Sequence, residues 1–206
     1  MLDSRARAVL HSPVERAATA IDQPWITPNR LTLVGLLLGV ASAAAAAGGL
    51  WVWALAAFLM SRIFDGLDGA LARRRAAPDA SPSAFGGYLD IVSDFTVYGS
   101  FVIGVGIGTG GPLLPFLVVL LAYYINGSTL LALSAVLGDQ NPATSEFRDG
   151  RAIVFTRGFA EGTETIVVHA LWCIVPFAAA PIAWIWAAVV LLTAGQRVVL
   201  AAHTLR

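Results

Sequence analysis

Four aspartates are spaced so that their carboxylates could act together. Asp65 and Asp68 lie three residues apart, and Asp90 and Asp94 lie four residues apart. Residues at either separation share one face of a helix, so each pair would direct two carboxylates the same way. Two antiparallel helices joined by a short link would bring both pairs together at one end of the molecule.

A cluster of four carboxylates needs a cation to neutralise it. An acidic side chain at the centre of a membrane already costs about 2.5–3.5 kcal/mol, and mutual repulsion adds to this. Carboxylate oxygens are hard ligands that select Mg²⁺, Mn²⁺ or Ca²⁺, and four of them could bridge two ions. Paired divalent ions clamp the attacking and leaving oxygens when a phosphoryl group is displaced. The aspartates therefore indicate a site for Mg²⁺ or Mn²⁺, with two ions, that acts on a pyrophosphate.

The residues that follow Asp68 suit a large substrate that carries phosphate. Gly69 and Ala72 lie one turn apart and leave room for a bulky group against the helix backbone. Arg73 can offer its guanidinium fork to a phosphate.

These residues form a pattern that resembles the signature of the CDP-alcohol phosphotransferases. The chain has Asp-x2-Asp-Gly-x2-Ala-Arg at 65–73 and Gly-x3-Asp-x3-Asp at 86–94. The stretch Thr-Pro-Asn-Arg-Leu-Thr at 27–32 is also similar to that family, so the resemblance covers about residues 25–200. One departure is the spacer of twelve residues between Arg73 and Gly86, which is longer than the family usually has.

The resemblance implies an enzyme that transfers a phosphatidyl group from CDP-diacylglycerol, or a similar CDP-linked lipid, to the hydroxyl of an alcohol and releases CMP. It also implies that Asp94 acts both as a metal ligand and as the general base. The metal ligands that it implies are Asp65, Asp68, Asp90 and Asp94. The residues that it implies for binding the CDP moiety are Gly69, Ala72, Arg73 and Gly86.

The acceptor alcohol is less well defined. In relatives that use inositol phosphate, basic residues in the last three helices hold the acceptor phosphate. By resemblance, Arg197 and Arg157 are the candidate acceptor-binding residues here, and anchoring at the membrane surface is the alternative role for both. No basic residue lies at 112–137. A sugar alcohol, its phosphate (inositol phosphate or glycerol phosphate) and a neutral alcohol therefore all stay open as acceptors.

Among the polar side chains in the second half of the chain, four more have an expected role. Glu161 and Glu164 are expected either to be stabilised by the dipole of the fifth span or to line the rim of the site. Asn126 is expected to bond a neighbouring helix. His169 is expected to be a buried core side chain.

The composition indicates that lipid is the main solvent. The chain has 206 residues, of which 57% are apolar and 13% charged, whereas a soluble domain has about 25% charged residues. The net charge of zero gives no basis for binding nucleic acid. The single cysteine, Cys173, excludes a disulfide within the monomer.

Apolar stretches recur along the chain, and they predict an all-α, polytopic membrane protein with six transmembrane helices. The second span is expected to continue as a helix to Arg73. Two domains are predicted. Residues 27–206 form the transmembrane domain, and residues 1–26 form an N-terminal segment with a short amphipathic helix at the membrane interface. The six predicted spans are 31–49, 50–64, 88–107, 112–137, 163–180 and 181–202.

The charged residues predict an orientation. The three short turns between paired spans carry no Arg, Asp or Glu. Because Arg-rich segments stay in the cytoplasm, we expect both termini and the active site on the cytoplasmic side of a bacterial-type cell membrane. Small residues such as Gly35 and Gly39 would permit a homodimer.

A divalent-cation transporter is the alternative function, since carboxylates within a membrane often mark ion pathways. Transporter sites lie near the midplane on interrupted helices, whereas these aspartates are predicted at one membrane end. They are also followed by Gly-x2-Ala-Arg, which an ion path does not need. The transferase is therefore favoured, with a CDP-linked lipid, an alcohol and membrane lipid as the expected partners.

Overall fold

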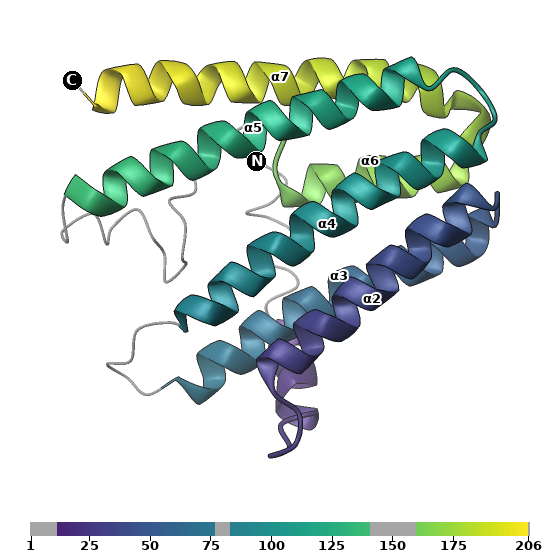
Figure 1. The fold of residues 1–206 in the computed structure, drawn as a ribbon. Helices are drawn as coiled ribbons and strands as arrows, with labels where there is room; N and C mark the ends of the chain where they lie inside the picture. The colour runs from purple at the N-terminus through teal and green to yellow at the C-terminus, as the bar shows by residue number, and fades with distance from the viewer. Residues whose placement is uncertain (1–11, 77–82, 141–159, 206) are drawn as a thin grey trace.

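The computed structural model describes residues 12–76, 83–140 and 160–205, and within these ranges the chain is helical without strands (Figure 1). A first helix occupies residues 12–20. A short 3-10 helix, Pro176–Ala178, precedes the last long helix. The six longer helices are α2 (Pro28–Ala47), α3 (Trp51–Arg75), α4 (Ala84–Gly108), α5 (Leu114–Gln140), α6 (Gly162–Ile174) and α7 (Ala179–Thr204).

Local sequence signals explain where the first long helices begin and end. Thr27 caps α2, as the Thr27-Pro28 pair predicts, and its hydroxyl accepts a hydrogen bond from the backbone N–H of Arg30. Ser83 caps α4 by accepting from the N–H of Gly86. In the turn after α2, Gly49 has a φ of 70°, a conformation that glycine adopts without strain.

Each of the six predicted spans overlaps one of the six helices α2–α7, which confirms that the described part of the chain is all-helical. By length and composition, four described segments could cross a membrane. The helix α3 carries several charges in its second half, and α6 has 13 residues, so neither is among the four. The count of six transmembrane helices therefore stays a prediction. The four segments are Pro28–Ala47, Ala84–Gly108, Leu114–Val136 and Pro176–Thr204.

The predicted boundary between the last two spans, at residues 180 and 181, is wrong. The helix α6 ends at Ile174, and Val175 leaves the helical region with φ −130° and ψ 63°. Proline disfavours the α conformation in the residue before it, so Pro176 explains the break. By contrast, Pro181 lies in the first turn of α7, where its missing N–H removes no helical bond.

The helices α2 and α4 approach each other at the level of their backbones. A Cβ added to Gly104 would overlap the backbone of Ala43, and one added to Gly108 would overlap the carbonyl oxygen of Ala46. The small side chains of the alanine run at 43–47 allow this close packing. Of the two glycines suggested for a homodimer, Gly39 faces Val97 of α4, and Gly35 faces α3. Both are covered within the protomer, so they give no support to a homodimer.

The helices fall into two packed groups (Figure 1). One group contains α2, α3 and α4, and the other contains α5 and α7, while α6 contacts α3, α4 and α7. His169 of α6 is fully buried between the groups, and its Nε2 lies 3.0 Å from the hydroxyl of Tyr123. Trp186 donates a hydrogen bond to the same hydroxyl at 2.7 Å. This confirms His169 as a core side chain.

The N-terminal helix packs against the ends of α2 and α3. Ala18 is fully buried in a cluster with residues of both helices, including Leu31 and Leu71. The following turn is held by Asp22, which accepts hydrogen bonds from Arg75 and Arg74. These bonds lower the pKa of Asp22. Residues 12–26 therefore dock on the helical domain, although placement at a membrane interface stays a prediction.

Candidate active site

The four aspartates lie where the end of α3 meets the beginning of α4. Asp65, Asp68 and Asp90 each offer a carboxylate oxygen, and these three oxygens lie within 4.8 Å of one another. The helical spacing of Asp65 and Asp68 provides the first pair, and the antiparallel course of α4 adds Asp90. Three of the four predicted metal ligands therefore converge, as the sequence predicts.

A hydroxyl from α2 fixes the most buried of these carboxylates. Asp68 is 6% exposed, and its Oδ2 accepts a hydrogen bond from the hydroxyl of Thr32, which is buried to the same extent. Sequence reasoning did not identify Thr32 as a site residue. The signal was present, because Thr32 closes the 27–32 stretch that resembles the CDP-alcohol phosphotransferases. The beginning of α2 is therefore part of the site.

The fourth aspartate has a different partner. Asp94 lies outside the group of three, and its Oδ1 forms a hydrogen-bonded ion pair with Nη1 of Arg62. The same Nη1 lies 3.8 Å from Oδ1 of Asp65, one helical turn away on α3. Metal ligation by Asp94 stays a prediction.

Arg62 was also missed by sequence reasoning, although an arginine within a predicted span was a usable signal. Its side chain is 6% exposed. The guanidinium lies over the ring of Tyr98, with 4.9 Å from its central carbon to the ring centroid, and Nη1 donates to the Tyr98 hydroxyl at 3.3 Å. Nη2 donates to the hydroxyl of Ser61 at 3.0 Å. The α3–α4 junction thus contains three converging carboxylates and a buried cation beside the fourth.

The residues predicted to bind CDP surround this junction on its more exposed side. Gly69 is half-buried, and a Cβ placed there would lie 3.2 Å from Nη1 of Arg73. Ala72 and Arg73 are exposed, and Gly86 is half-buried in the first turn of α4. Their role in binding a nucleotide stays a prediction.

Of the two candidate acceptor residues, Arg197 lies in the described part of the chain and Arg157 does not. Arg197 of α7 is buried, and its Nη1 donates to Oδ1 of Asn126 at 2.8 Å and to the backbone carbonyl of the same residue at 3.2 Å. This confirms that Asn126 bonds a neighbouring helix. Arg157 lies outside the described residues.

Glu161 is the N-cap residue of α6 and Glu164 lies in its first turn, where the helix dipole favours a carboxylate.

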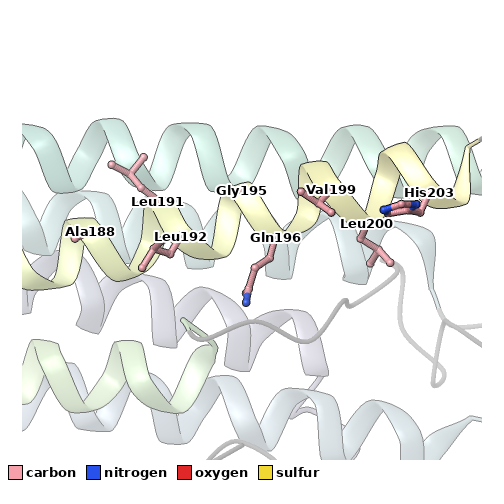
Figure 2. A pocket seen from close by; sticks show the side chains of 8 residues that line it. All are labelled: Ala188, Leu191, Leu192, Gly195, Gln196, Val199, Leu200 and His203. Atoms are coloured by element: carbon pink, nitrogen blue, oxygen red, sulfur yellow. The ribbon is translucent and has the colours of Figure 1, made fainter.

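A hollow of about 890 Å³ follows one face of α7 (Figure 2). Leu192, Gln196 and Leu200 point to the same side of the helix in this view. None of the four aspartates lines the hollow, and all of its lining residues come from α7. We assign it no part in the chemistry of the α3–α4 junction.

The sequence is similar to proteins of known family. A family model described as CDP-alcohol phosphatidyltransferase matches residues 25–192. The inner membrane protein YnjF of Escherichia coli (strain K12) is 35% identical over 186 residues, which cover 85% of this chain and 83% of that protein. The archaetidylinositol phosphate synthase of Methanothermobacter thermautotrophicus is 39% identical over 87 residues, or 42% of this chain and 43% of that protein.

The fold is similar to that of solved structures. The Mycobacterium tuberculosis phosphatidylinositol phosphate synthase with CDP-DAG bound aligns with a TM-score of 0.70 and 20% identity, covering 90% of this chain and 91% of that one. The same enzyme in complex with manganese and citrate aligns with a TM-score of 0.69 and 21% identity, covering 90% and 87%. At this level of identity, the likeness establishes a common fold.

Proposed function

This chain belongs to the CDP-alcohol phosphatidyltransferase family, and from that premise we propose that it transfers the phosphatidyl-type group of a CDP-linked lipid to the hydroxyl of an alcohol, with release of CMP. The observation that carries the proposal is the convergence of Asp65, Asp68 and Asp90 at the junction of α3 and α4. These residues come from the two halves of the pattern that resembles the family signature. A CDP-linked donor is supported by the related enzyme whose structure contains CDP-DAG.

The three converging carboxylates fit a divalent cation. Their oxygens lie close enough for a shared ion, and Asp68 is buried with a hydroxyl as its partner. Hard oxygen ligands of this kind suit Mg²⁺ or Mn²⁺. When bound, such an ion would neutralise charge on the phosphate oxygens of the donor. We propose Asp65, Asp68 and Asp90 as the ligands of this ion.

The protein's own side chains would carry the proton and hold the donor. We assign to Asp94 the acceptance of the proton from the acceptor hydroxyl, so that the alcohol oxygen can bond to the β-phosphorus while the bond from that phosphorus to the CMP oxygen breaks. Gly69 would allow the donor to approach the backbone of α3. Arg73, whose side chain is 66% exposed, would pair with a donor phosphate.

The acceptor is an alcohol whose headgroup is to be identified by assay. A phosphorylated sugar alcohol is supported by the buried guanidinium of Arg197 and by the similarity to the archaetidylinositol phosphate synthase. A neutral alcohol is supported by the engagement of Arg197 with Asn126. We further propose that both termini and the junction of α3 and α4 face the cytoplasm.

The decisive experiment measures CMP release by the purified protein in detergent. CDP-diacylglycerol would be supplied with inositol phosphate, glycerol phosphate, inositol or a neutral alcohol, and the lipid product identified by mass spectrometry. We expect one acceptor to support CMP release that stops in EDTA and returns with Mg²⁺ or Mn²⁺. Asp68→Asn should be inactive. Uptake of Mn²⁺ into proteoliposomes without CMP release from any pair would overturn the proposal in favour of a transporter.

A further inference from the structure

Arg62 is a buried cation within the carboxylate cluster, and neither the predicted metal ligands nor the predicted substrate ligands include it. Its side chain is 6% exposed, although it belongs to an otherwise apolar stretch of α3. A buried guanidinium is costly unless its charge and its N–H groups are paired. In Arg62 both Nη atoms are paired, and only Nε is buried without a hydrogen-bond partner. The partners of Arg62 therefore show what holds it in place.

Three contacts from two helices fix the guanidinium. The Tyr98 ring lies beneath it, the Tyr98 hydroxyl accepts from Nη1, and the Ser61 hydroxyl accepts from Nη2. Ser61 is itself anchored, because its hydroxyl donates to the backbone carbonyl of Gly35 on α2 at 2.7 Å. A planar group held on its face and on both Nη atoms has little freedom to turn. Arg62 is thus a rigid support shared by α2, α3 and α4.

The fixed guanidinium of Arg62 binds one oxygen of Asp94. Nη1 of Arg62 binds Oδ1, so the orientation of that carboxylate follows the orientation of the guanidinium. The other oxygen, Oδ2, stays available for the acceptor hydroxyl. Tyr98 lies one helical turn after Asp94 on α4, so the contacts of Arg62 to both residues lock two adjacent turns of α4 to α3.

We propose that Arg62 is a positioning residue that holds Asp94 in the orientation in which its free oxygen accepts the proton of the acceptor alcohol. This inference rests on the proposed transferase activity. In that step Asp94 takes the proton, the alcohol oxygen bonds to the β-phosphorus, and CMP leaves with the bridging oxygen. In this proposal Arg62 contacts neither substrate. Its effect is confined to the step that needs Asp94, so it acts on turnover and leaves donor binding unchanged.

The test compares Arg62→Met and Arg62→Lys with the control Arg74→Met, which removes an exposed arginine from the same helix. We would measure kcat, the KM for CDP-diacylglycerol, and Mn²⁺ affinity by electron paramagnetic resonance. A misplaced catalytic group loses about 10²-fold in rate. We therefore expect Arg62→Met to lower kcat at least 50-fold, with the KM within threefold and Mn²⁺ bound no more weakly than in the wild type. The kcat of Arg62→Lys should be at least fivefold higher than that of Arg62→Met and at least fivefold lower than that of the wild type.

Several results would overturn the inference. A kcat for Arg62→Met above one third of the wild-type value would do so. A fall in kcat joined by weaker Mn²⁺ binding and a higher KM would show a structural role instead. If Arg62→Met is not recovered as folded protein, Arg62→Lys decides, and wild-type turnover in that variant would refute the positioning role. Absence of CMP release from the wild type with every acceptor would instead refute the transferase proposal itself.

Discussion

Thr32→Val should weaken the binding of Mn²⁺ to the carboxylate cluster. Valine has nearly the shape of threonine but removes the hydroxyl that donates to Oδ2 of Asp68, where both side chains are 6% exposed. A hydrogen bond to a charged group contributes about 1.5–3 kcal/mol. Since each 1.4 kcal/mol is a factor of ten, the loss corresponds to about 10–150-fold in affinity. That range agrees with the 10–100-fold typical of residues that support a metal ligand.

The assay is a titration of detergent-purified protein with Mn²⁺, followed by electron paramagnetic resonance of the free ion. Thr204→Val is the matched control. It makes the same substitution near the end of α7, where the hydroxyl donates to the backbone carbonyl of Leu200 at 2.9 Å. The control should bind Mn²⁺ like the wild type. If Thr32→Val binds Mn²⁺ within threefold of the wild type, the hydroxyl does not support the ligand and the reasoning is refuted.

Three further outcomes are expected. Asp94→Asn should slow CMP release about 10²–10⁴-fold, while the Kd for CDP-diacylglycerol stays within a few-fold. The reason is that an amide keeps the size of the carboxylate but cannot take the proton. Retained turnover would show that Asp94 is not the base. In a chain without its native cysteine, Asp79→Cys should resist a membrane-impermeant thiol reagent applied to intact cells, and Gly110→Cys should react; the reverse pattern would invert the proposed orientation. Gly104→Ala should lower the free energy of unfolding by about 1–3 kcal/mol, the usual effect of overpacking. The comparison is with Gly99→Ala, where nothing lies within 4 Å of the added carbon. Equal melting temperatures of the two variants would contradict the close contact of α2 and α4.

The sequence predicted the carboxylate cluster because its determinants are local. Helical spacing places Asp65 with Asp68, and a short link returns the chain so that Asp90 joins them. Both relations involve residues close in sequence, and the structure confirms the convergence of these three. The helical regions were predictable for a similar reason, since most of them are long apolar stretches bounded by glycine, proline or a capping residue.

The supporting contacts were not predictable in the same way. Thr32 meets a carboxylate 36 residues away, and Arg62 meets one 32 residues away. Both contacts depend on how three helices pack, and no short-range pattern specifies that packing. The error at the end of α6 had a local signal, because Pro176 marks the break at Val175, whereas Pro181 is tolerated in a first turn. Packing therefore determined which polar residues reach the site, and proline position determined where α6 ends.

The shortness of α6 has a consequence for the surrounding bilayer. Its 13 residues rise about 20 Å, against a hydrocarbon thickness of about 30 Å. Just before α6, the N–H of Ala160 donates to the hydroxyl of Thr193 at 3.0 Å, so this buried donor has a protein partner in place of water. Val167, Leu171 and Ile174 leave one side of α6 exposed. With α6 crossing the membrane as predicted, lipid tails along that side would meet a shorter apolar wall than the tails along α7. A change in acyl-chain length would then strain the protein first beside α6.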